Sequence, residues 1–340
     1  MRDKLFIDGE WVGAASGATF PTIDPATEEP IQEVAKGGTA DVDRAVQAGD
    51  RAMRGPWREM APAERGGLLL RLAERIRAAR EDLAALETAD MGKPISQARG
   101  DVDGVVATLV YNAGAADKME GATIPLGPEV LDFTLLEPLG VTAHIVPWNF
   151  PLGMAMRSLA PALAAGCTAV LKPAEQSPRS ALRLAELVAE VGFPKGVVNV
   201  VTGFGGDGTG DEAGEALVRH PLVRGISFTG SLQTGQRIMA AAAEGVKPLV
   251  LELGGKNPML VFEDADLERA VDDAIEAAFD NAGQVCSSAS RLLLQRPIEA
   301  AFIERFEARA KELRIGPGRG DPDLGPIAFA EQYRKVMDYI

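Results

Sequence analysis

Apolar residues in the first quarter of the chain recur at intervals of three and four, which trace one face of a helix. They are Leu69, Leu72, Ile76, Ala79, Leu83 and Leu86. This spacing predicts one continuous amphipathic helix over residues 63–86. We therefore expect the N-terminal third of the chain to be largely helical.

Short β-rich runs alternate with helical stretches from residue 141 onward. The runs are 141–146, 168–171, 197–201, 225–228 and 249–253, and the helical stretches are 152–165, 179–191, 212–218 and 234–243. This alternation predicts an α/β fold whose sheet is mainly parallel, with right-handed crossovers. Ligands of such sheets gather at the carboxyl ends of the strands, so polar side chains at those ends are candidates for function.

Two further patterns lie on either side of this region. Between 119 and 138, Gly, Pro and polar residues surround the apolar run 130–136, which predicts a hairpin that serves an interface. Near the end, one amphipathic helix carries Phe302, Phe306, Ala310 and Leu313, and a second carries Tyr333, Val336 and Ile340. No Gly, Asn or Pro follows Ile340, so we expect the chain to be cut inside a helix.

Composition narrows the class of protein. With 340 residues, 46% hydrophobic and 25% charged, the chain is long enough for two globular domains. The net charge of −14 disfavours nucleic acid and anionic membranes as partners. We expect no signal peptide at the start, and the apolar stretch 162–171 is shorter than the roughly 20 residues that a membrane span needs. Two Cys cannot build a disulfide framework, which favours the cytoplasm.

Only two His and two Cys are present, so a Ser-His-Asp triad, a Cys-His dyad or a zinc site has few residues to draw on. Cys286 lies among Gly, Gln and Ser, which is typical of an accessible nucleophilic thiol, although packing is the alternative for any single Cys. Cys167 lies among small apolar residues and is expected to be buried. If the protein is an enzyme, Cys286 is the expected nucleophile.

Glu252 lies within the apolar run 249–253. It shares one strand face with Val250, whereas Leu249, Leu251 and Leu253 take the other. We expect its carboxylate to be desolvated, which suits a general base. The alternative is a structural Glu that pairs with a backbone N–H or with a cation such as Lys256.

Asn149 follows the predicted strand 141–146 and stands between Pro147 and Pro151, which impose a rigid turn. An amide fixed at that position can donate a hydrogen bond to a developing oxyanion. The alternative is a turn Asn that bonds its own backbone.

Three residues at other strand ends suit a dinucleotide. Lys172 and Glu175 can bind the two hydroxyls of a ribose, and Glu175 would repel a 2′-phosphate; a solvated ion pair is the alternative. Ser231 is a predicted N-cap, and free N–H groups at such a helix start bind pyrophosphate. Gly230 and Gly235 do not match the Gly-x-Gly-x-x-Gly fingerprint, so a capped helix without a ligand stays open.

Five segments together resemble the aldehyde dehydrogenase superfamily. They are Pro147-Trp148-Asn149-Phe150-Pro151, Leu171-Lys172-Pro173-Ala174-Glu175, Phe228-Thr229-Gly230-Ser231, Leu251-Glu252-Leu253-Gly254-Gly255-Lys256 and Gly283-Gln284-Val285-Cys286. The resemblance implies a Rossmann-type NAD-binding domain at 1–118 and 139–253, an oligomerisation hairpin at 119–138 and a partial catalytic domain at 254–340. It also implies a small-molecule aldehyde as substrate and a homodimer or homotetramer at full length.

The resemblance further assigns roles to the residues above. Cys286 is the expected nucleophile and Glu252 the base that hydrolyses its thioester, which favours release of a carboxylic acid over transfer to coenzyme A. Asn149 is the expected oxyanion donor. The expected cofactor is NAD, with NADP disfavoured, and its expected contacts are Pro147, Trp148, Lys172, Glu175, Gly230, Ser231 and Gly254; no metal is expected.

The chain also departs from the family pattern. Neither the Glu-x-Phe-Gly-Pro motif, whose Glu holds the nicotinamide ribose in relatives, nor the closing strand that pairs across subunits is found. A noncatalytic NAD-binding module and a cofactor-independent thiol esterase therefore stand as alternatives to an aldehyde-oxidising enzyme.

Overall fold

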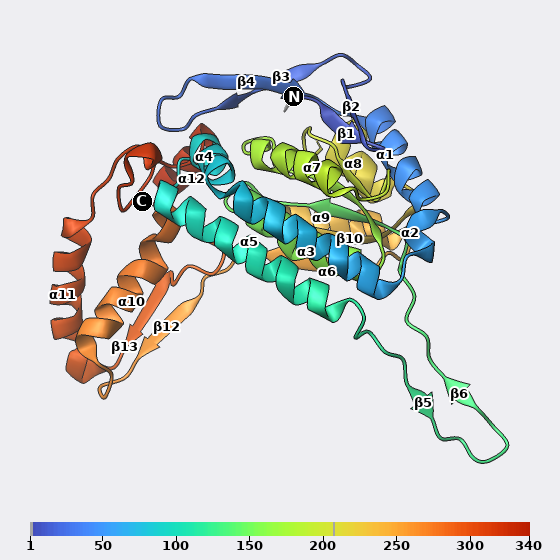
Figure 1. Ribbon diagram of the computed structural model, residues 1–340. Helices are drawn as coiled ribbons and strands as arrows, with labels where there is room; N and C mark the ends of the chain where they lie inside the picture. The colour runs from blue at the N-terminus through green and yellow to red at the C-terminus, as the bar shows by residue number, and fades with distance from the viewer. Residues whose placement is uncertain (1–2, 207) are drawn as a thin grey trace.

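A seven-stranded sheet forms the centre of the computed structural model, which describes residues 3–206 and 208–340 (Figure 1). The strand order is β11-β10-β7-β8-β9-β1-β2. Five strands are parallel: β7 (Val141–Ile145), β8 (Thr168–Lys172), β9 (Val198–Val200), β10 (Val223–Gly230) and β11 (Leu249–Leu253). The prediction of a mainly parallel α/β sheet is confirmed. Residues 1, 2 and 207, which fall in the predicted cofactor domain, lie outside the described residues.

Helices cover both faces of this sheet, and each face has its own apolar core. One face carries α3 (Pro62–Ala78), α5 (Ile95–Ala115), α6 (Pro151–Ala164) and α7 (Arg179–Val191), and the other carries α1 (Thr39–Ala52), α8 (Ala213–Arg219) and α9 (Leu232–Ala243). Along β8, Ala169 and Leu171 enter the first core while Val170 enters the second. This two-sided burial explains why three successive residues of β8, Ala169, Val170 and Leu171, are all apolar.

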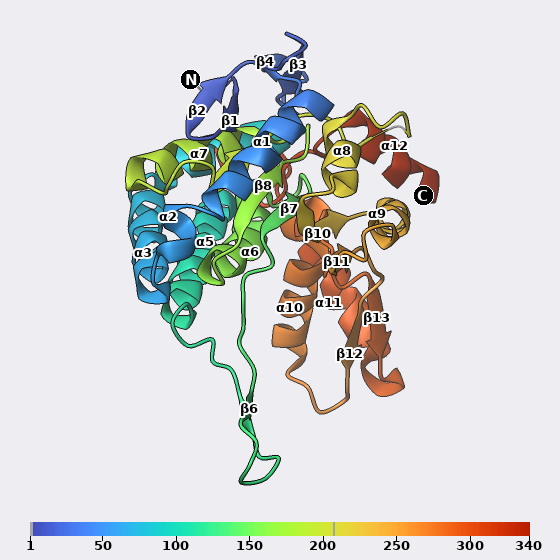
Figure 2. The ribbon, with the colours of Figure 1, turned by 90° about the vertical axis from the view of Figure 1, so that its right-hand side faces the viewer.

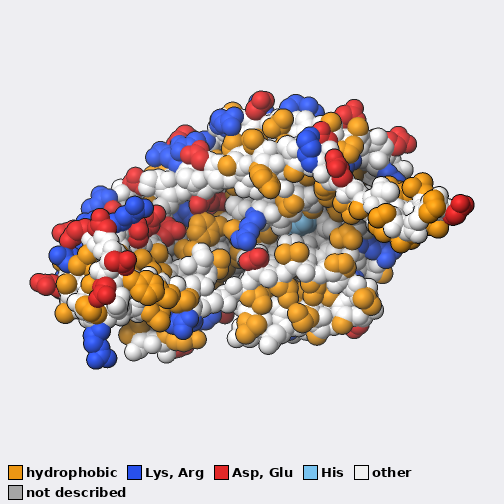
Figure 3. Space-filling view, turned by 90° about the horizontal axis from the view of Figure 1, so that it is seen from below, with side chains coloured by type: hydrophobic (Ala, Val, Ile, Leu, Met, Phe, Trp, Pro, Cys, Tyr) orange, Lys and Arg blue, Asp and Glu red, His pale blue; other side chains and the backbone are white. Residues whose placement is uncertain are grey.

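The face that carries α6 is open at β10 and β11. Val250 on β11 is 58% exposed, and a cavity of about 380 Å³ is lined there by His144, Arg157, Val250 and Glu252 among others. Figure 3 shows apolar side chains gathered over the underside of the molecule. Leu249, Leu251 and Leu253 point to the other side of β11 and pack into the core beneath α9.

Two predictions about the N-terminal third are wrong in part. The helix predicted over 63–86 is broken at Ala79 (φ −94°, ψ 14°), which separates α3 from α4 (Arg80–Met91). Residues before α1 form four strands: β1 (Leu5–Ile7), β2 (Glu10–Val12), β3 (Thr19–Ile23) and β4 (Pro30–Ala35). Between β1 and β2, Asp8 and Gly9 both have positive φ, which is the Asp-Gly turn of a tight hairpin.

The predicted hairpin at 119–138 is present. Strands β5 (Thr123–Ile124) and β6 (Asp132–Phe133) pair antiparallel, and Figures 1 and 2 show them projecting far from the body of the molecule. Its exposed large apolar side chains are Met119, Ile124, Leu126, Val130, Leu131, Phe133, Leu135 and Leu136. Such a hairpin buries little surface of its own.

A smaller unit follows β11 and has a separate apolar core. It contains the parallel pair β12 (Pro258–Val261) and β13 (Arg291–Leu294) together with α10 (Leu267–Phe279) and α11 (Glu299–Glu312). The predicted helix with Phe302 and Phe306 is α11, and the predicted terminal helix is α12 (Ala330–Tyr339). The division of the chain at residue 253 stays a prediction, and the separate core agrees with it.

The loop between α11 and α12 lies against the segment that joins α4 to α5. A Cβ atom added to Gly318 would meet Lys93 O at 2.3 Å, and one added to Gly325 would meet Gly92 O at 2.1 Å. Two stretches of backbone therefore touch directly where the smaller unit meets the main body.

Candidate active site

The predicted site segments lie at one edge of the sheet. Residues 146–150 follow β7, residues 173–176 follow β8, Ser231 follows β10 and Gly254 follows β11. These strands are parallel, so their carboxyl ends share one edge of the sheet. The strand order reverses between β7 and β10, and this switch point is where open α/β sheets bind ligands.

Asn149 is joined to the segment that carries Cys286. Its Nδ2 donates to Gln284 O at 2.8 Å, and its backbone O accepts from Asn281 Nδ2 at 3.2 Å. The side chain therefore does not bond its own turn. Its second N–H donates to no residue in the described part of the chain, which leaves it available to an oxyanion.

Cys286 is an exposed free thiol, as predicted, whereas Cys167 is buried. Burial raises the pKa of the Cys167 thiol, which keeps it protonated and unreactive. The backbone around Cys286 is held by Asn257, whose Nδ2 donates to Cys286 O at 2.9 Å and to Ser288 O at 3.0 Å. A long-range side-chain contact thus fixes the loop that presents the thiol.

The prediction that Glu252 is desolvated is wrong. Its side chain is 47% exposed because the face of β11 that it shares with Val250 is open. Its Oε1 lies 3.4 Å from Arg157 Nη2, so the partner is Arg157 on α6 and not Lys256 or a backbone N–H. The cavity beside Glu252 does not include Cys286. A hydrogen bond therefore joins Asn149 to the loop that carries Cys286, whereas the ion-pair partner of Glu252 is Arg157.

Lys172 and Glu175 form an ion pair in which Lys172 Nζ lies 3.3 Å from Glu175 Oε2. The Lys172 side chain is 3% exposed, so this is not a solvated surface pair. Burial lowers the pKa of Lys172, and its Nζ also donates to Pro173 O at 3.0 Å. The Lys172 ammonium is thus fixed at the end of β8, while Glu175 keeps partial access to solvent.

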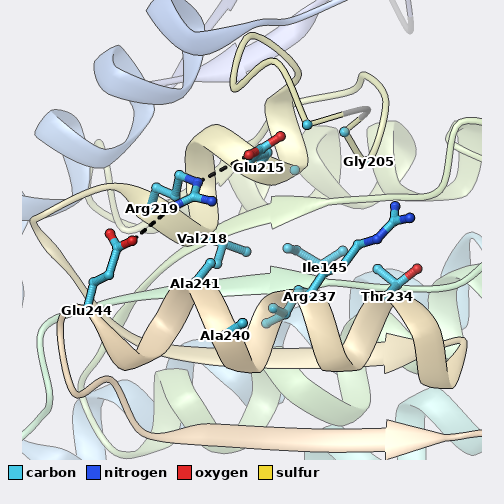
Figure 4. A pocket seen from close by; sticks show the side chains of 14 residues that line it. Ile145, Gly205, Glu215, Val218, Arg219, Thr234, Arg237, Ala240, Ala241 and Glu244 are labelled. Carbon is cyan, nitrogen blue, oxygen red and sulfur yellow. Dashed lines mark hydrogen bonds and ion pairs between the residues drawn. The ribbon is translucent and has the colours of Figure 1, made fainter.

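Ser231 caps α9 as predicted, because its Oγ accepts from Thr234 N at 3.2 Å. Next to this helix start, a cavity of about 660 Å³ opens between α8, α9 and the end of β7 (Figure 4). Thr234 and Arg237 line it from α9, and Gly205 lines it from the loop after β9. This loop was not predicted as part of the site, although the density of Gly between 203 and 210 is a usable signal in the sequence.

Charged residues close the far end of this cavity. Arg219 on α8 pairs with Glu215 at 3.2 Å and with Glu244 at 3.3 Å (Figure 4). Its apolar lining includes Ile145, Val218 and Ile238. The apolar part of this lining suits a flat heterocycle.

The remaining predicted contacts lie close by. Trp148 packs edge-on against Phe329 with ring centroids 5.1 Å apart, and its backbone O accepts from Ser177 Oγ at 2.9 Å. Pro147 follows β7, Gly230 is the last residue of β10 and Gly254 follows β11. In the part of the chain that the structure describes, no group of three or more His, Cys, Asp or Glu is arranged to hold a metal ion. No described helix has both the length and the apolar character required to cross a membrane.

A buried ion cluster lies under the Asn149 turn. Lys93 pairs with Asp101 and has its Nζ 3.9 Å from Glu87 Oε2 and 4.1 Å from the centre of the Phe150 ring. Glu87 Oε1 accepts from Leu152 N at 2.7 Å, at the start of α6. Burial raises the pKa of Glu87, and the Lys93 cation opposes that rise.

Replacing Lys93 with Met is expected to destabilise the fold by about 3–5 kcal/mol, because it leaves the fully buried Glu87 without its cation. Denaturant unfolding measures this loss. Without Lys93 the pKa of folded Glu87 rises further above its unfolded value, so stability falls as pH rises. The deficit should therefore shrink toward acidic pH.

Lys195→Met is the matched control, since Lys195 pairs with Glu10 on the surface. It should change the free energy of unfolding by no more than about 0.5 kcal/mol. Equal losses in both variants would contradict the role assigned to the buried cluster.

Comparison with known proteins gives a consistent result. The model described as the aldehyde dehydrogenase family matches residues 11–340. Over 338 residues the chain is 48% identical to the hydroxyisobutyraldehyde dehydrogenase of Mycolicibacterium austroafricanum, covering 99% of this chain and 66% of that protein. Over 343 residues it is 46% identical to the mitochondrial aldehyde dehydrogenase of Equus caballus, covering 99% and 68%.

Solved structures agree with the sequence comparisons. The NAD⁺ complex of the aldehyde dehydrogenase from Bacillus cereus matches with a TM-score of 0.96 and 43% identity, covering 99% of this chain and 68% of that one. The structure of PnpE from Pseudomonas sp. WBC-3 matches with a TM-score of 0.96 and 46% identity, covering 100% and 69%. The chain thus spans about two thirds of the length of the relatives that it matches.

Proposed function

Since the chain belongs to the aldehyde dehydrogenase family, we propose that the complete protein is an oxidoreductase that converts an aldehyde to a carboxylic acid with NAD. The observation that carries this proposal is the contact between Asn149 Nδ2 and Gln284 O at 2.8 Å. It holds a free amide N–H beside the loop that exposes the Cys286 thiol. A nucleophile and an oxyanion donor are thereby brought together from distant parts of the sequence.

The Cys286 thiolate attacks the aldehyde carbon, and the electron pair of the carbonyl moves to oxygen. Asn149 and the backbone N–H of Cys286 donate hydrogen bonds to that oxygen. When bound, NAD supplies the chemistry of accepting the hydride. Cys286 is left holding the acyl group as a thioester.

Glu252 then serves as the base of hydrolysis. It takes a proton from water, the resulting hydroxide adds to the thioester carbon, and cleavage of the C–S bond releases the acid and restores Cys286. Because Glu252 pairs with Arg157 on an open face, we expect its carboxylate to leave Arg157 during this step. Both groups are exposed, so breaking their ion pair costs little.

The residues at the sheet edge fit a dinucleotide. The cavity between α8 and α9 can hold the adenine, the start of α9 at Ser231 can hold the pyrophosphate, and Lys172 with Glu175 can hold the adenosine ribose. Pro147, Trp148, Gly230 and Gly254 complete the proposed contacts. The Glu175 carboxylate supports NAD over NADP, because it would repel a 2′-phosphate.

We also propose that the hairpin at 119–138 binds a second copy of the chain in a homodimer or homotetramer. Its projection and its exposed Leu131, Leu135 and Leu136 support this. The two free thiols support a reducing, cytoplasmic location. The assigned domains are 1–118 with 139–253 for NAD and 254–340 for part of the catalytic unit.

An aldehyde panel tests the proposed function. The complete gene product is incubated with NAD and aliphatic, aromatic, amino-substituted or semialdehyde substrates, and NADH absorbance is followed. At least one aldehyde should give NADH and its acid in equal amounts. NAD binding without turnover on any aldehyde would instead support a noncatalytic module, and hydrolysis of an activated ester without NAD would support a thiol esterase.

Replacing Glu175 with Gln is expected to raise the ratio of kcat/KM with NADP to kcat/KM with NAD by about tenfold, since the repulsion of a 2′-phosphate is removed. Steady-state kinetics with both cofactors measure this ratio. Glu129→Gln, on the exposed hairpin, is the control and should leave the ratio unchanged. An unchanged ratio in Glu175→Gln would show that Glu175 does not select between NAD and NADP.

A further inference from the structure

Three successive residues with left-handed backbone precede the Cys286 loop. Asn281 has φ 49°, Ala282 has φ 57° and Gly283 has φ 74°. Left-handed backbone costs an L-residue other than Gly or Asn roughly 1–2 kcal/mol. Such a turn persists only where surrounding contacts hold it, and strained turns of this kind concentrate at functional sites.

Asn281 supplies the contacts that hold this turn against Asn149. Its side chain is buried, with 2% of the residue exposed. Its Nδ2 donates to Asn149 O at 3.2 Å and to Gln284 O at 3.4 Å. Gln284 O is also the oxygen that accepts the hydrogen bond from Asn149 Nδ2 at 2.8 Å. Asn281 thus bonds both partners of the contact that orients Asn149.

Gln284 closes this network. Its backbone N and its Nε2 donate to Asn281 O at 3.1 and 3.0 Å, and its Oε1 accepts from Ala328 N at 3.0 Å. Asn149 and Cys286 sit at opposite ends of the network, since Cys286 follows Gln284 by two residues. Among the residues that the structure describes, the hydrogen bonds between Asn149 and residues 281–286 involve Asn281 or Gln284.

We propose that Asn281 is a positioning residue that aims the free N–H of Asn149 at the oxyanion formed on the Cys286 substrate. The proposal rests on the proposed function, because it assigns Asn149 to the oxyanion. Asn281 touches neither substrate nor cofactor in this scheme. It acts by fixing the amide plane of Asn149, so its effect should vanish when Asn149 has no amide.

A double-mutant cycle in the complete protein tests this dependence. Asn149→Ala is expected to lower kcat about 10²–10³-fold, the usual loss for one oxyanion donor. Asn281→Ala is expected to lower kcat by about 10²-fold with an unchanged KM for NAD. The double variant should be no slower than Asn149→Ala alone. Multiplied losses would overturn the proposal, because Asn281 would then act independently of Asn149.

Two further variants separate the amide of Asn281 from its backbone conformation. Asn281→Gly keeps the left-handed conformation without the amide, so it should lose as much activity as Asn281→Ala. Full activity of Asn281→Gly would show that the turn alone matters and would overturn the proposal. The rate at which iodoacetamide alkylates Cys286 should stay the same in every variant; a changed rate in Asn281→Gly would mean that the loop itself has moved, which also overturns it.

A crystal structure of the Asn281→Ala variant decides the same point without turnover. Asn149 Nδ2 should lie beyond hydrogen-bond distance of Gln284 O, and an unchanged contact would overturn the positioning role. If the unaltered protein oxidises no aldehyde, the proposed function fails. The structure of the variant still tells whether Asn281 aims Asn149.

Discussion

Replacing Cys286 with Ala is expected to lower kcat for aldehyde oxidation by at least about 10⁴-fold, because no other group can form the covalent intermediate. The only other thiol, Cys167, is buried, and burial raises its pKa. NADH formation measures the loss. NAD affinity, measured by calorimetry, should stay within about twofold, since the Cys286 side chain is exposed and lies outside the cavity between α8 and α9.

Cys167→Ala is the matched control for this experiment. It removes a thiol from the core and should keep the kcat of the unaltered protein, at a cost in stability of about 1 kcal/mol. If Cys167→Ala lost activity while Cys286→Ala kept it, Cys167 would be the nucleophile and the mechanism would be overturned. Cys286→Ala is also expected to abolish ester hydrolysis, so an ester assay of this variant does not distinguish a dehydrogenase from an esterase. The dependence of activity on NAD distinguishes them.

Replacing Glu252 with Gln is expected to slow steady-state turnover by about 10²–10³-fold while leaving acylation fast. The Gln side chain has the size of Glu but cannot take a proton from water. A burst of NADH close to one equivalent per site should therefore precede the slow phase. Mass spectrometry of the quenched protein should find the acyl group on Cys286.

The stability of this variant should barely change, because the lost ion pair with Arg157 is exposed on both sides. Glu263→Gln, at another exposed position, is the control and should show neither burst nor slow phase. Unchanged turnover of Glu252→Gln without an acyl adduct would assign hydrolysis to a different base. Rapid transfer of the acyl group to added coenzyme A by the unaltered protein would contradict the hydrolytic assignment.

Parts of the fold were predictable where burial is dictated by local pattern. The strand at 249–253 and the helix at 179–191 have the predicted bounds, since Leu249, Leu251 and Leu253 pack one face of the strand against a core and the helix has a regular buried stripe. The break at Ala79 was not predictable from the apolar spacing of residues 63–86. Leu83 is buried in the same core as Leu72 on the other side of the break, so the apolar spacing continues through it.

The first strands were missed for a different reason. Strands β1 and β2 have three residues each, too few for an alternating pattern to stand out. The Asp8-Gly9 pair was the available signal, and both residues take the positive φ that such a turn requires.

The site divides in the same way. Asn149, Lys172 and Ser231 were proposed because motifs at strand ends mark them, and Cys286 was proposed because Gly, Gln and Ser surround it. Asn257 and Asn281 were not predicted, because their roles depend on hydrogen bonds to residues far away in the sequence. Asn281, for example, donates to Asn149 O. Exposure of Glu252 was also beyond the pattern of its strand, since it depends on which neighbouring elements cover that face of β11.

The bare backbone contact at Gly318 and Gly325 sets a limit on how this protein can vary. A methyl group at either position would clash with the backbone of Gly92 and Lys93 and force the α11–α12 loop away from that segment. The same loop leads to Ala328, whose N–H holds the Gln284 side chain. A substitution at either glycine would thus displace the Ala328 N–H that holds Gln284 in the Cys286 loop. Mutations at these positions, which are distant from Cys286 along the chain, are therefore expected to affect catalysis.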